Sequence, residues 1–235
     1  MTPPMWLAES SMQRLSILAP SGDLYASVRV DATEYLSRLR DVQRLRNTAF
    51  AAHGMTADHL DEYASDDEQC WHIVMTNDEG TATACVRCLD QPNTVDVTEL
   101  RAYAPEWPAD MVAAVASDLG EARRAGFWYG EWGSFVVDAS RRGTTEALVV
   151  ALAAYALGRL RGGALGLTLA NVKYGAASIL RRIAADETVL PGYFDSRYYA
   201  DVELVRFDSR RPASKYERMV VTLQERLATV PVLCG

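Results

Sequence analysis

The spacing of hydrophobic and polar residues changes several times along the chain between a helical and an extended period. Between residues 32 and 52, apolar residues recur every three or four positions, which predicts an amphipathic helix ending at Gly54. Runs 70–75 and 81–89 flank a stretch of turn-forming residues, so they predict a β-hairpin. Further helices are predicted at 56–64, 111–124, 145–161 and 174–185, and further strands at 16–20, 26–30, 132–138, 164–170, 198–207 and 217–223.

The order of these elements predicts the fold class. Strand 132–138, helix 145–161 and strand 164–170 follow one another directly, which indicates a parallel crossover. The hairpin at 70–89 is antiparallel, so we expect an α/β (α+β) fold with a mixed central sheet and helices on both faces. Neither a repeated unit nor a linker is visible, and residues 1–235 are interpreted as one domain with an N-terminal extension at 1–30.

Composition narrows the classes of function. The chain has 235 residues and a net charge of −7, which argues against general nucleic-acid binding but leaves room for a local basic pocket. Its longest apolar run, 147–157, is too short to span a membrane. The beginning of the chain has no basic region followed by an apolar core, and four cysteines in this length do not suggest a disulfide framework. We therefore expect a cytoplasmic protein.

The turn at 140–144, Ser-Arg-Arg-Gly-Thr, is a candidate anion site. It joins a buried strand to an apolar helix, and the first amides of a helix carry partial positive charge without intrahelical partners. Glycine allows close approach of an anion and the two arginines add charge. The alternative interpretation is a solvated turn with two surface arginines.

This strand, turn, helix and strand, followed by a helix from near Asn171, resemble the acyl-thioester-binding core of the GNAT acyltransferase superfamily. In that family the turn reads Arg/Gln-x-x-Gly-x-Gly/Ala and its amides bind the coenzyme A pyrophosphate. Here it reads Arg142-Gly-Thr-Thr-Glu-Ala147, where Glu146 adds negative charge. The single phosphate of a carrier-protein pantetheine arm would need less positive charge from this turn than a pyrophosphate. The resemblance implies acyl-CoA or acyl-phosphopantetheine as donor, with no metal. The implied donor-binding residues are Phe135, Val136, Val137, Arg141, Arg142, Gly143, Thr144 and Thr145.

A second set of residues is similar to the acyl-homoserine-lactone synthases and related N-acyl amino acid synthases. Arg46-Asn-Thr-Ala-Phe50 matches Arg-x-x-x-Phe on the first helix, acids follow at 61–67, and Glu131 precedes the central strand. The strand departs from the family pattern because no arginine follows Ser134. The resemblance covers about residues 35–210 and implies a small amine or amino-acid acceptor, with acyl carrier protein as a candidate partner. The implied acceptor-binding residues are Arg46, Phe50, Arg87, Trp132 and Tyr198.

Three of these residues have an interpretation of their own. Arg46 falls within the apolar stripe of its helix, so it needs a partner. That partner is either one of the acids at 61–67, or a substrate carboxylate or ordered active-site loops. Glu131 is the candidate general base, with a pKa raised by burial, unless it is an exposed loop acid. Ser134 could order a water or the pantetheine arm, or simply occupy a strand position.

Other chemistries find less support. Cys85 and Cys88 would point to opposite faces of a strand, which is wrong for joint metal ligation, and the histidines show no ligand spacing. The family's thiolate-protonating tyrosine is replaced by Leu180, leaving Tyr174, Tyr198 or Tyr199 as substitutes. We therefore expect an N-acyltransferase. The alternatives are an acyl-homoserine-lactone synthase and a catalytically inactive GNAT-like protein that binds a ligand or carrier. Oligomeric state is not indicated.

Overall fold

The computed structural model describes residues 15–20, 32–54, 64–92, 94–184, 189–198, 200–212, 214–230 and 232–234. The strands are β1 (Leu15–Ala19), β2 (Cys70–Thr76), β3 (Ala82–Gln91), β4 (Trp128–Val137), β5 (Ala164–Asn171), β6 (Val189–Asp195), β7 (Ala200–Asp208) and β8 (Val232–Cys234). The α-helices are α2 (Ala32–Ala51), α4 (Ala109–Ala125), α5 (Glu146–Leu160), α6 (Ala176–Ile183) and α7 (Glu217–Leu227). Short 3-10 helices lie at 67–69, 97–99, 139–141 and 214–216.

The strands form one mixed sheet in the order β6-β7-β5-β4-β3-β2-β1-β8. Its parallel pairs are β4 with β5 and β1 with β8, and the remaining neighbours are antiparallel. The expected hairpin and the expected parallel crossover are both confirmed, and so is the mixed sheet.

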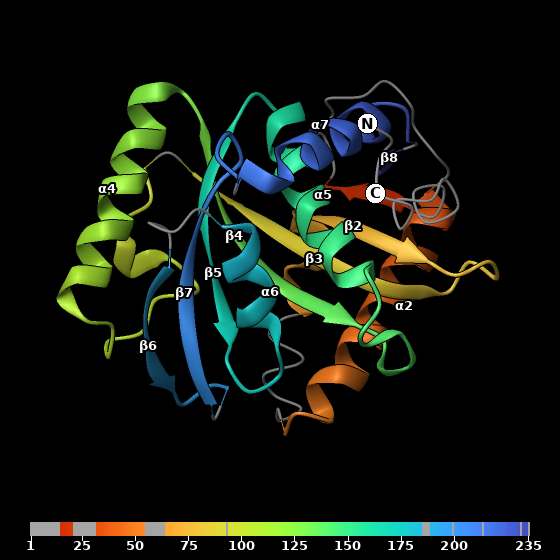
Figure 1. The fold of residues 1–235 in the computed structure, drawn as a ribbon, viewed down its shortest axis with the longest axis horizontal. Coiled ribbons are helices and arrows are strands. Elements are labelled where there is room, and N and C mark those ends of the chain that lie inside the picture. The colour runs from red at the N-terminus through yellow and green to blue at the C-terminus, as the bar shows by residue number, and fades with distance from the viewer. Residues whose placement is uncertain are drawn as a thin grey trace.

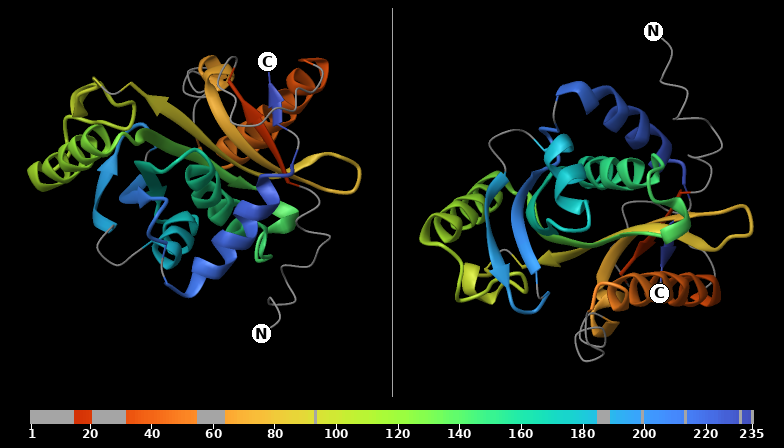
Figure 2. Two further views of the ribbon diagram at one scale, coloured as in Figure 1. Left: turned by 90° about the horizontal axis from the view of Figure 1, so that it is seen from above. Right: turned by 60° about the horizontal axis from the view of Figure 1, so that its bottom comes forward.

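Helices cover both faces of this sheet (Figures 1 and 2). Helices α5, α6 and α7 lie on one face, and α2 and α4 lie on the other, towards opposite ends of the sheet. Helix α5 is buried from Val149 to Gly158, as its nearly continuous apolar sequence predicts, because it is packed between the sheet and α7. No helix among the described residues is long and apolar enough to cross a membrane.

Strands β4 and β5 pair only over their first halves. Their register runs from Trp128 opposite Ala164 to Glu131 opposite Leu167. Close approach there depends on glycine, since a Cβ on Gly166 would lie 2.0 Å from the Gly130 carbonyl oxygen. Beyond Glu131 the two strands have no paired positions, so the sheet opens into a splay between their carboxyl ends.

A β-bulge on β4 shapes the edge of this splay. The register with β3 shifts between Cys85 and Arg87, so Ser134 and Phe135 together oppose Val86. Ser134 has a φ of 51°, and among the described residues it is the one residue other than glycine whose φ is positive. Such a conformation costs of order 1–3 kcal/mol and persists only where surrounding structure imposes it.

Several boundaries differ from the sequence predictions. Strand β4 begins at Trp128 rather than 132, so Glu131 lies within the strand instead of ahead of it. Residues 217–223, predicted as a strand, belong to helix α7, whose buried residues Met219, Val220, Leu223 and Leu227 follow a helical period. Strands β6 and β8 were not predicted, and β7 begins at Ala200 rather than 198. The predicted strand at 26–30 and almost all of the predicted helix at 56–64 lie outside the described residues.

Candidate active site

A cavity of about 550 Å³ occupies the splay between β4 and β5. It reaches both faces of the sheet, because its wall includes Phe50 of α2 and Glu131 on one face and Ala147 of α5 and Leu180 of α6 on the other. A two-sided cavity of this kind can hold two substrates that meet in the gap between the strands.

The bare edge of β4 supplies hydrogen-bonding backbone groups to the cavity. The Asp138 amide donates to the Thr83 carbonyl of β3 at 2.8 Å, so Val136 also directs its backbone groups to β3. By alternation, the backbone groups of Phe135 and Val137 face the splay. Of the three residues predicted to hold the donor through their backbone, Phe135 and Val137 are therefore oriented for it, whereas Val136 is not.

The predicted anion turn lies at one end of the cavity. Arg141, Arg142 and Gly143 line the wall, while Thr144 and Thr145 do not. Gly143 has φ 81° and open space around its Cα, so the turn depends on a left-handed residue there. Thr145 is the N-cap of α5, and Arg141 Nε lies 3.7 Å from Glu146 Oε1. Glu146 thus offsets part of the charge that the turn offers an anion.

One further cationic group, Lys173, and an aromatic pair lie beside this turn. His53, just after α2, stacks on Tyr174 with ring centroids 3.6 Å apart, and both rings line the cavity together with Lys173. Burial and the positive charges of Arg142 and Lys173 lower the pKa of His53 below its ordinary value. An anion bound between Arg142 and Lys173 would offset the repulsion between these two cations.

Glu131 is buried at the opposite side of the splay, with an exposed fraction of 8%. Its Oε1 accepts hydrogen bonds from Gln91 Nε2 at 2.6 Å and the Arg101 amide at 2.9 Å, and its Oε2 accepts from the Ala102 amide at 2.6 Å. Burial raises the pKa of Glu131 above its ordinary value, although these three donors oppose the shift. A carboxylate has about four acceptor positions, so one lone pair of Oε2 remains for a proton.

Arg46 is fully buried and does not line the cavity. Its guanidinium donates to both oxygens of Asp67, at 2.7 and 2.5 Å, and Arg87 donates to the same carboxylate at 3.0 Å. Of the partners considered for Arg46, the structure shows an acid within 61–67, so Arg46 does not itself contact an acceptor in the cavity. Burial alone would raise the pKa of Asp67, but Arg46, His72 and Arg87 lower it. Arg87 does line the cavity, so Arg46 contributes to the wall through Asp67 and Arg87.

Two arginines in the wall were not identified from the sequence. Arg101 forms an ion pair with Asp66, and Arg197 binds Asp195 through Nε at 3.0 Å. Neither is close in sequence to the elements that carry Glu131, so only the tertiary fold reveals them. Among the residues that the structure describes, the cavity wall contains six cations and one acid, although the chain as a whole is acidic: Arg87, Arg101, Arg141, Arg142, Lys173 and Arg197, with Glu131.

The remaining predicted residues are placed as follows. Phe50, Trp132, Ser134 and Tyr198 all line the cavity. Ser134 is 8% exposed, and its Oγ has no hydrogen-bond partner among the described residues, so it is available to a ligand. Of the candidate tyrosines, Tyr174 and Tyr198 line the cavity, and Tyr199 lies outside the described residues.

A smaller apolar pocket of about 30 Å³ adjoins the main cavity. The two share Trp132, Phe135, Thr168 and Leu180, and the small pocket ends against Tyr155 of α5. Its size corresponds to about one methylene group or water molecule.

Metal ligation finds no support in the described part of the chain. No group of three His, Cys, Asp or Glu residues there could hold a metal ion. Cys85 belongs to the hydrophobic cluster beneath α2, and Cys88 belongs to the cluster on the α5 face. Their predicted orientation to opposite faces of the strand is therefore confirmed.

No family model matches the sequence, and a search of curated proteins finds no match. The fold is similar to solved structures of BjaI, a coenzyme A-dependent acyl-homoserine lactone synthase. The form with MTA is 15% identical, with 88% of this chain and 92% of that chain covered and a TM-score of 0.53. The form with SAM and isopentyl-CoA is 15% identical, with 89% and 93% covered and a TM-score of 0.51. FeeM, an N-acyl amino acid synthase from uncultured soil microbes, is 16% identical, with 73% and 91% covered and a TM-score of 0.46. The chain therefore has a GNAT-like fold.

Proposed function

We propose that the protein is an N-acyltransferase that moves an acyl group from an acyl thioester to the amine of a small, amino-acid-like acceptor. The observation that carries this proposal is the cavity through the β4/β5 splay, which joins the turn at Arg141, Arg142 and Gly143 on one side to Glu131 and three arginines on the other. The GNAT-like fold supports it.

The donor occupies the side of the cavity next to α5 and α6. Its pantetheine arm pairs with the backbone of Phe135 and Val137, and its phosphate binds at Gly143 between Arg142 and Lys173. Because Glu146 offsets the charge of Arg141, a carrier-protein arm with one phosphate suits this turn at least as well as coenzyme A. The end of the acyl chain points to the small apolar pocket behind Leu180.

The acceptor occupies the side next to α2, where Arg87 and Arg101 favour a carboxylate. Arg197 adds only its charge, because Asp195 and the carbonyls of 101–103 occupy its donors. Its amine attacks the thioester carbonyl, a C–N bond forms, the C–S bond breaks and the donor leaves as a thiolate. Glu131 accepts the proton of the amine, directly or through a water, and Ser134 Oγ orders the reacting groups. Tyr174 or Tyr198 supplies the proton to the thiolate. Most of the acceleration comes from holding the two substrates together.

A thiol-release assay tests this function. Acyl-CoA and acyl-carrier-protein donors are combined with amino acids, each paired with the amine that lacks only its carboxylate. We expect thiol release with an amide product detected by mass spectrometry, and a preference for the carboxylated member of each pair. Glu131→Gln should lower kcat by about 10²- to 10⁴-fold, whereas Glu203→Gln, which alters a β7 carboxylate paired with Arg181 outside the cavity, should not.

The same assay separates the alternatives. S-adenosylmethionine belongs in the acceptor panel, because one of the similar solved structures is a lactone synthase bound to SAM and isopentyl-CoA. A lactone product would identify an acyl-homoserine-lactone synthase. Pantetheine binding without turnover for any pair would instead identify a binding protein, and full activity of the Glu131→Gln protein would refute the role of the base.

A further inference from the structure

The same tetrapeptide, Phe-Asp-Ser-Arg, spans the ends of two neighbouring strands, at 194–197 for β6 and at 207–210 for β7. Both copies form the same local turn. Asp195 accepts hydrogen bonds from the backbone amide of Arg197 at 2.9 Å and from Arg197 Nε at 3.0 Å. Asp208 accepts the same two hydrogen bonds from Arg210, at 2.9 Å and 2.8 Å. The two arginine side chains are also similarly exposed, at 31% and 32%.

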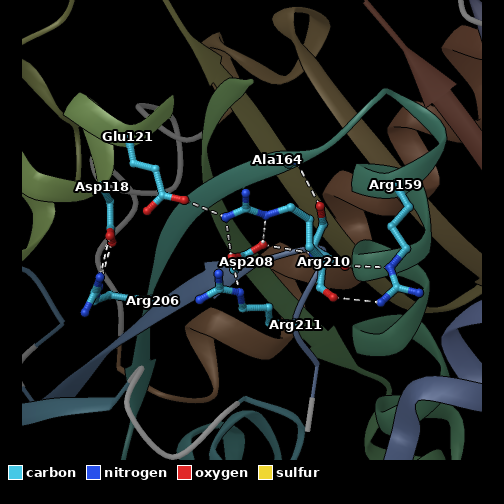
Figure 3. Close-up of polar contacts among 9 residues, drawn as sticks. Asp118, Glu121, Arg159, Ala164, Arg206, Asp208, Arg210 and Arg211 are labelled. Carbon is cyan, nitrogen blue, oxygen red and sulfur yellow. Dashed lines mark hydrogen bonds and ion pairs between the residues drawn. The ribbon is translucent and has the colours of Figure 1, made fainter. Parts of the chain in front are cut away.

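The second copy fastens helices to the sheet (Figure 3). Arg210 donates to Glu121 of α4 at 2.7 Å, and Arg159 of α5 donates to the carbonyls of Ser209 and Arg210 at 2.7 and 3.1 Å. Nearby, Arg206 of β7 pairs with Asp118 of α4. None of these residues lines the cavity, so this copy serves packing alone.

The first copy directs its guanidinium to the wall of the cavity instead. Arg197 donates to the carbonyls of Arg101 at 2.8 Å, Ala102 at 2.9 Å and Tyr103 at 3.3 Å. The amides of Arg101 and Ala102 are the two that donate to Glu131. Arg197 and Glu131 thus hold opposite edges of the same short backbone segment.

The same segment is anchored twice more. The Arg101 side chain pairs with Asp66. Further along the loop, Trp107 Nε1 donates to Tyr193 OH at 2.8 Å, and Tyr193 donates to Asp195 at 2.9 Å. Charge therefore alternates from Asp195 through Arg197 and the peptide groups to Glu131, and hydrogen bonds in such a chain strengthen one another.

We propose that Arg197 is a positioning residue for the reaction. By binding the carbonyls of 101–103 it aims the amides of Arg101 and Ala102 at Glu131, and so holds that carboxylate at the acceptor side of the cavity. This inference rests on the proposed function only in assigning Glu131 the proton of the acceptor. The geometry of the clamp stands without it.

Removing Arg197 should change the basicity of Glu131 in a defined direction. Amide donors stabilise the carboxylate form, and the segment would lose its fixed orientation, so the pKa of Glu131 should rise further. The other groups facing Glu131 are not altered by that substitution: Gln91 and Cys88 of β3, Tyr129 of β4, the Arg101 side chain of the loop, and Arg87 across the cavity.

The test compares Arg197→Gln with Arg210→Gln, which disrupts the same tetrapeptide turn away from the cavity. The ¹³C carboxyl signal of Glu131, assigned by its loss in Glu131→Gln, is followed as a function of pH, together with the pH profile of kcat/KM. We expect Arg197→Gln to move both the titration and the acidic limb to higher pH by about one pH unit. Arg210→Gln should lower only the melting temperature. If Arg197→Gln does not fold, Arg197→Lys, which cannot reach three carbonyls at once, serves in its place.

Two outcomes would overturn the inference. One is a Glu131 titration that is unchanged in the Arg197 variants, and the other is an equal shift in Arg210→Gln. The carboxyl titration requires no substrate, so it remains decisive if the acyl-transfer assay fails. A shifted titration without a shifted kinetic limb would keep the clamp and remove Glu131 from the proton transfer.

Discussion

His72 should make the stability of this protein depend on pH between about 4 and 6.5. The ring is fully buried on β2, where Nε2 donates to the Asp67 carbonyl at 2.8 Å and Nδ1 has no partner among the described residues. Burial lowers the pKa of His72 to about 4, and the nearby charge of Asp67 only partly opposes this. In the unfolded chain the imidazole titrates near its ordinary value of about 6.5.

The sign follows from which state takes up the proton. Below pH 6.5 the unfolded chain binds a proton that the folded protein refuses, so the free energy of unfolding falls as the pH falls. Each pH unit of difference corresponds to about 1.4 kcal/mol, which gives a loss of roughly 2.5 kcal/mol between pH 7 and pH 4.5. Below pH 4 His72 adds no further change, and the lowered pKa of Asp67 makes the loss of that ion pair the next event.

Urea unfolding followed by tryptophan fluorescence measures this effect. His72→Gln keeps an amide donor at about the reach of Nε2 and does not titrate. Other carboxylates protonate in both proteins, so the difference between the two proteins isolates His72. We expect the wild type to lose roughly 2.5 kcal/mol more than the variant between pH 7 and pH 4.5. Parallel pH dependences, or a His72 NMR titration near pH 6.5 in the folded protein, would refute the assignment.

Three further outcomes are expected. Asp67→Asn leaves two buried arginines without their carboxylate and should lower the free energy of unfolding by about 3–5 kcal/mol. The melting temperature should then fall by roughly 6–20 °C. Asp41→Asn, which alters a more exposed ion pair, should change the melting temperature little. Gly143→Ala should raise KM for the donor about five- to tenfold because it strains a left-handed turn, whereas Gly162→Ala at φ 90° outside the cavity should leave KM unchanged. Leu180→Ala should join the small pocket to the cavity and shift the acyl-length preference upward by one or more methylene groups, and an unchanged chain-length profile would contradict that placement.

The features that the sequence predicted correctly are those that depend on the local spacing of apolar and polar residues. The hairpin, the crossover and the buried helix α5 depend on neighbouring residues alone, and all three are confirmed. The buried partner of Arg46 was also predictable, because a cation within an apolar stripe must be neutralised nearby. Helix α7 was misassigned although its buried residues at 219, 220, 223 and 227 carried the helical period. Strand β6 escaped notice because Pro191 and Gly192 interrupt its pattern, which an edge strand tolerates.

The features that escaped prediction depend on pairing between distant segments. The bulge at Ser134 exists only because β3 and β4 differ by one residue in register, and neither strand alone reveals it. The sequence predicted that this strand begins at 132, which places Glu131 ahead of it. Strand β4 begins at Trp128, so Glu131 lies within the strand. Arg101 and Arg197 are separated by almost a hundred residues and meet at a single backbone segment.

The acids of this chain explain how an acidic protein carries a positive cavity. Three acids outside the wall each form an ion pair with an arginine of the wall. The pairs are Asp66 with Arg101, Asp67 with Arg87, and Asp195 with Arg197. Each acid therefore fixes the direction of one cation while leaving the inner surface cationic. A net charge of −7 argues against a broad basic surface, but it places no limit on a pocket in which acids lie behind the arginines of the wall. If the proposed function holds, selectivity for an anionic acceptor depends on how these acids orient the arginines, and less on how many arginines the chain contains.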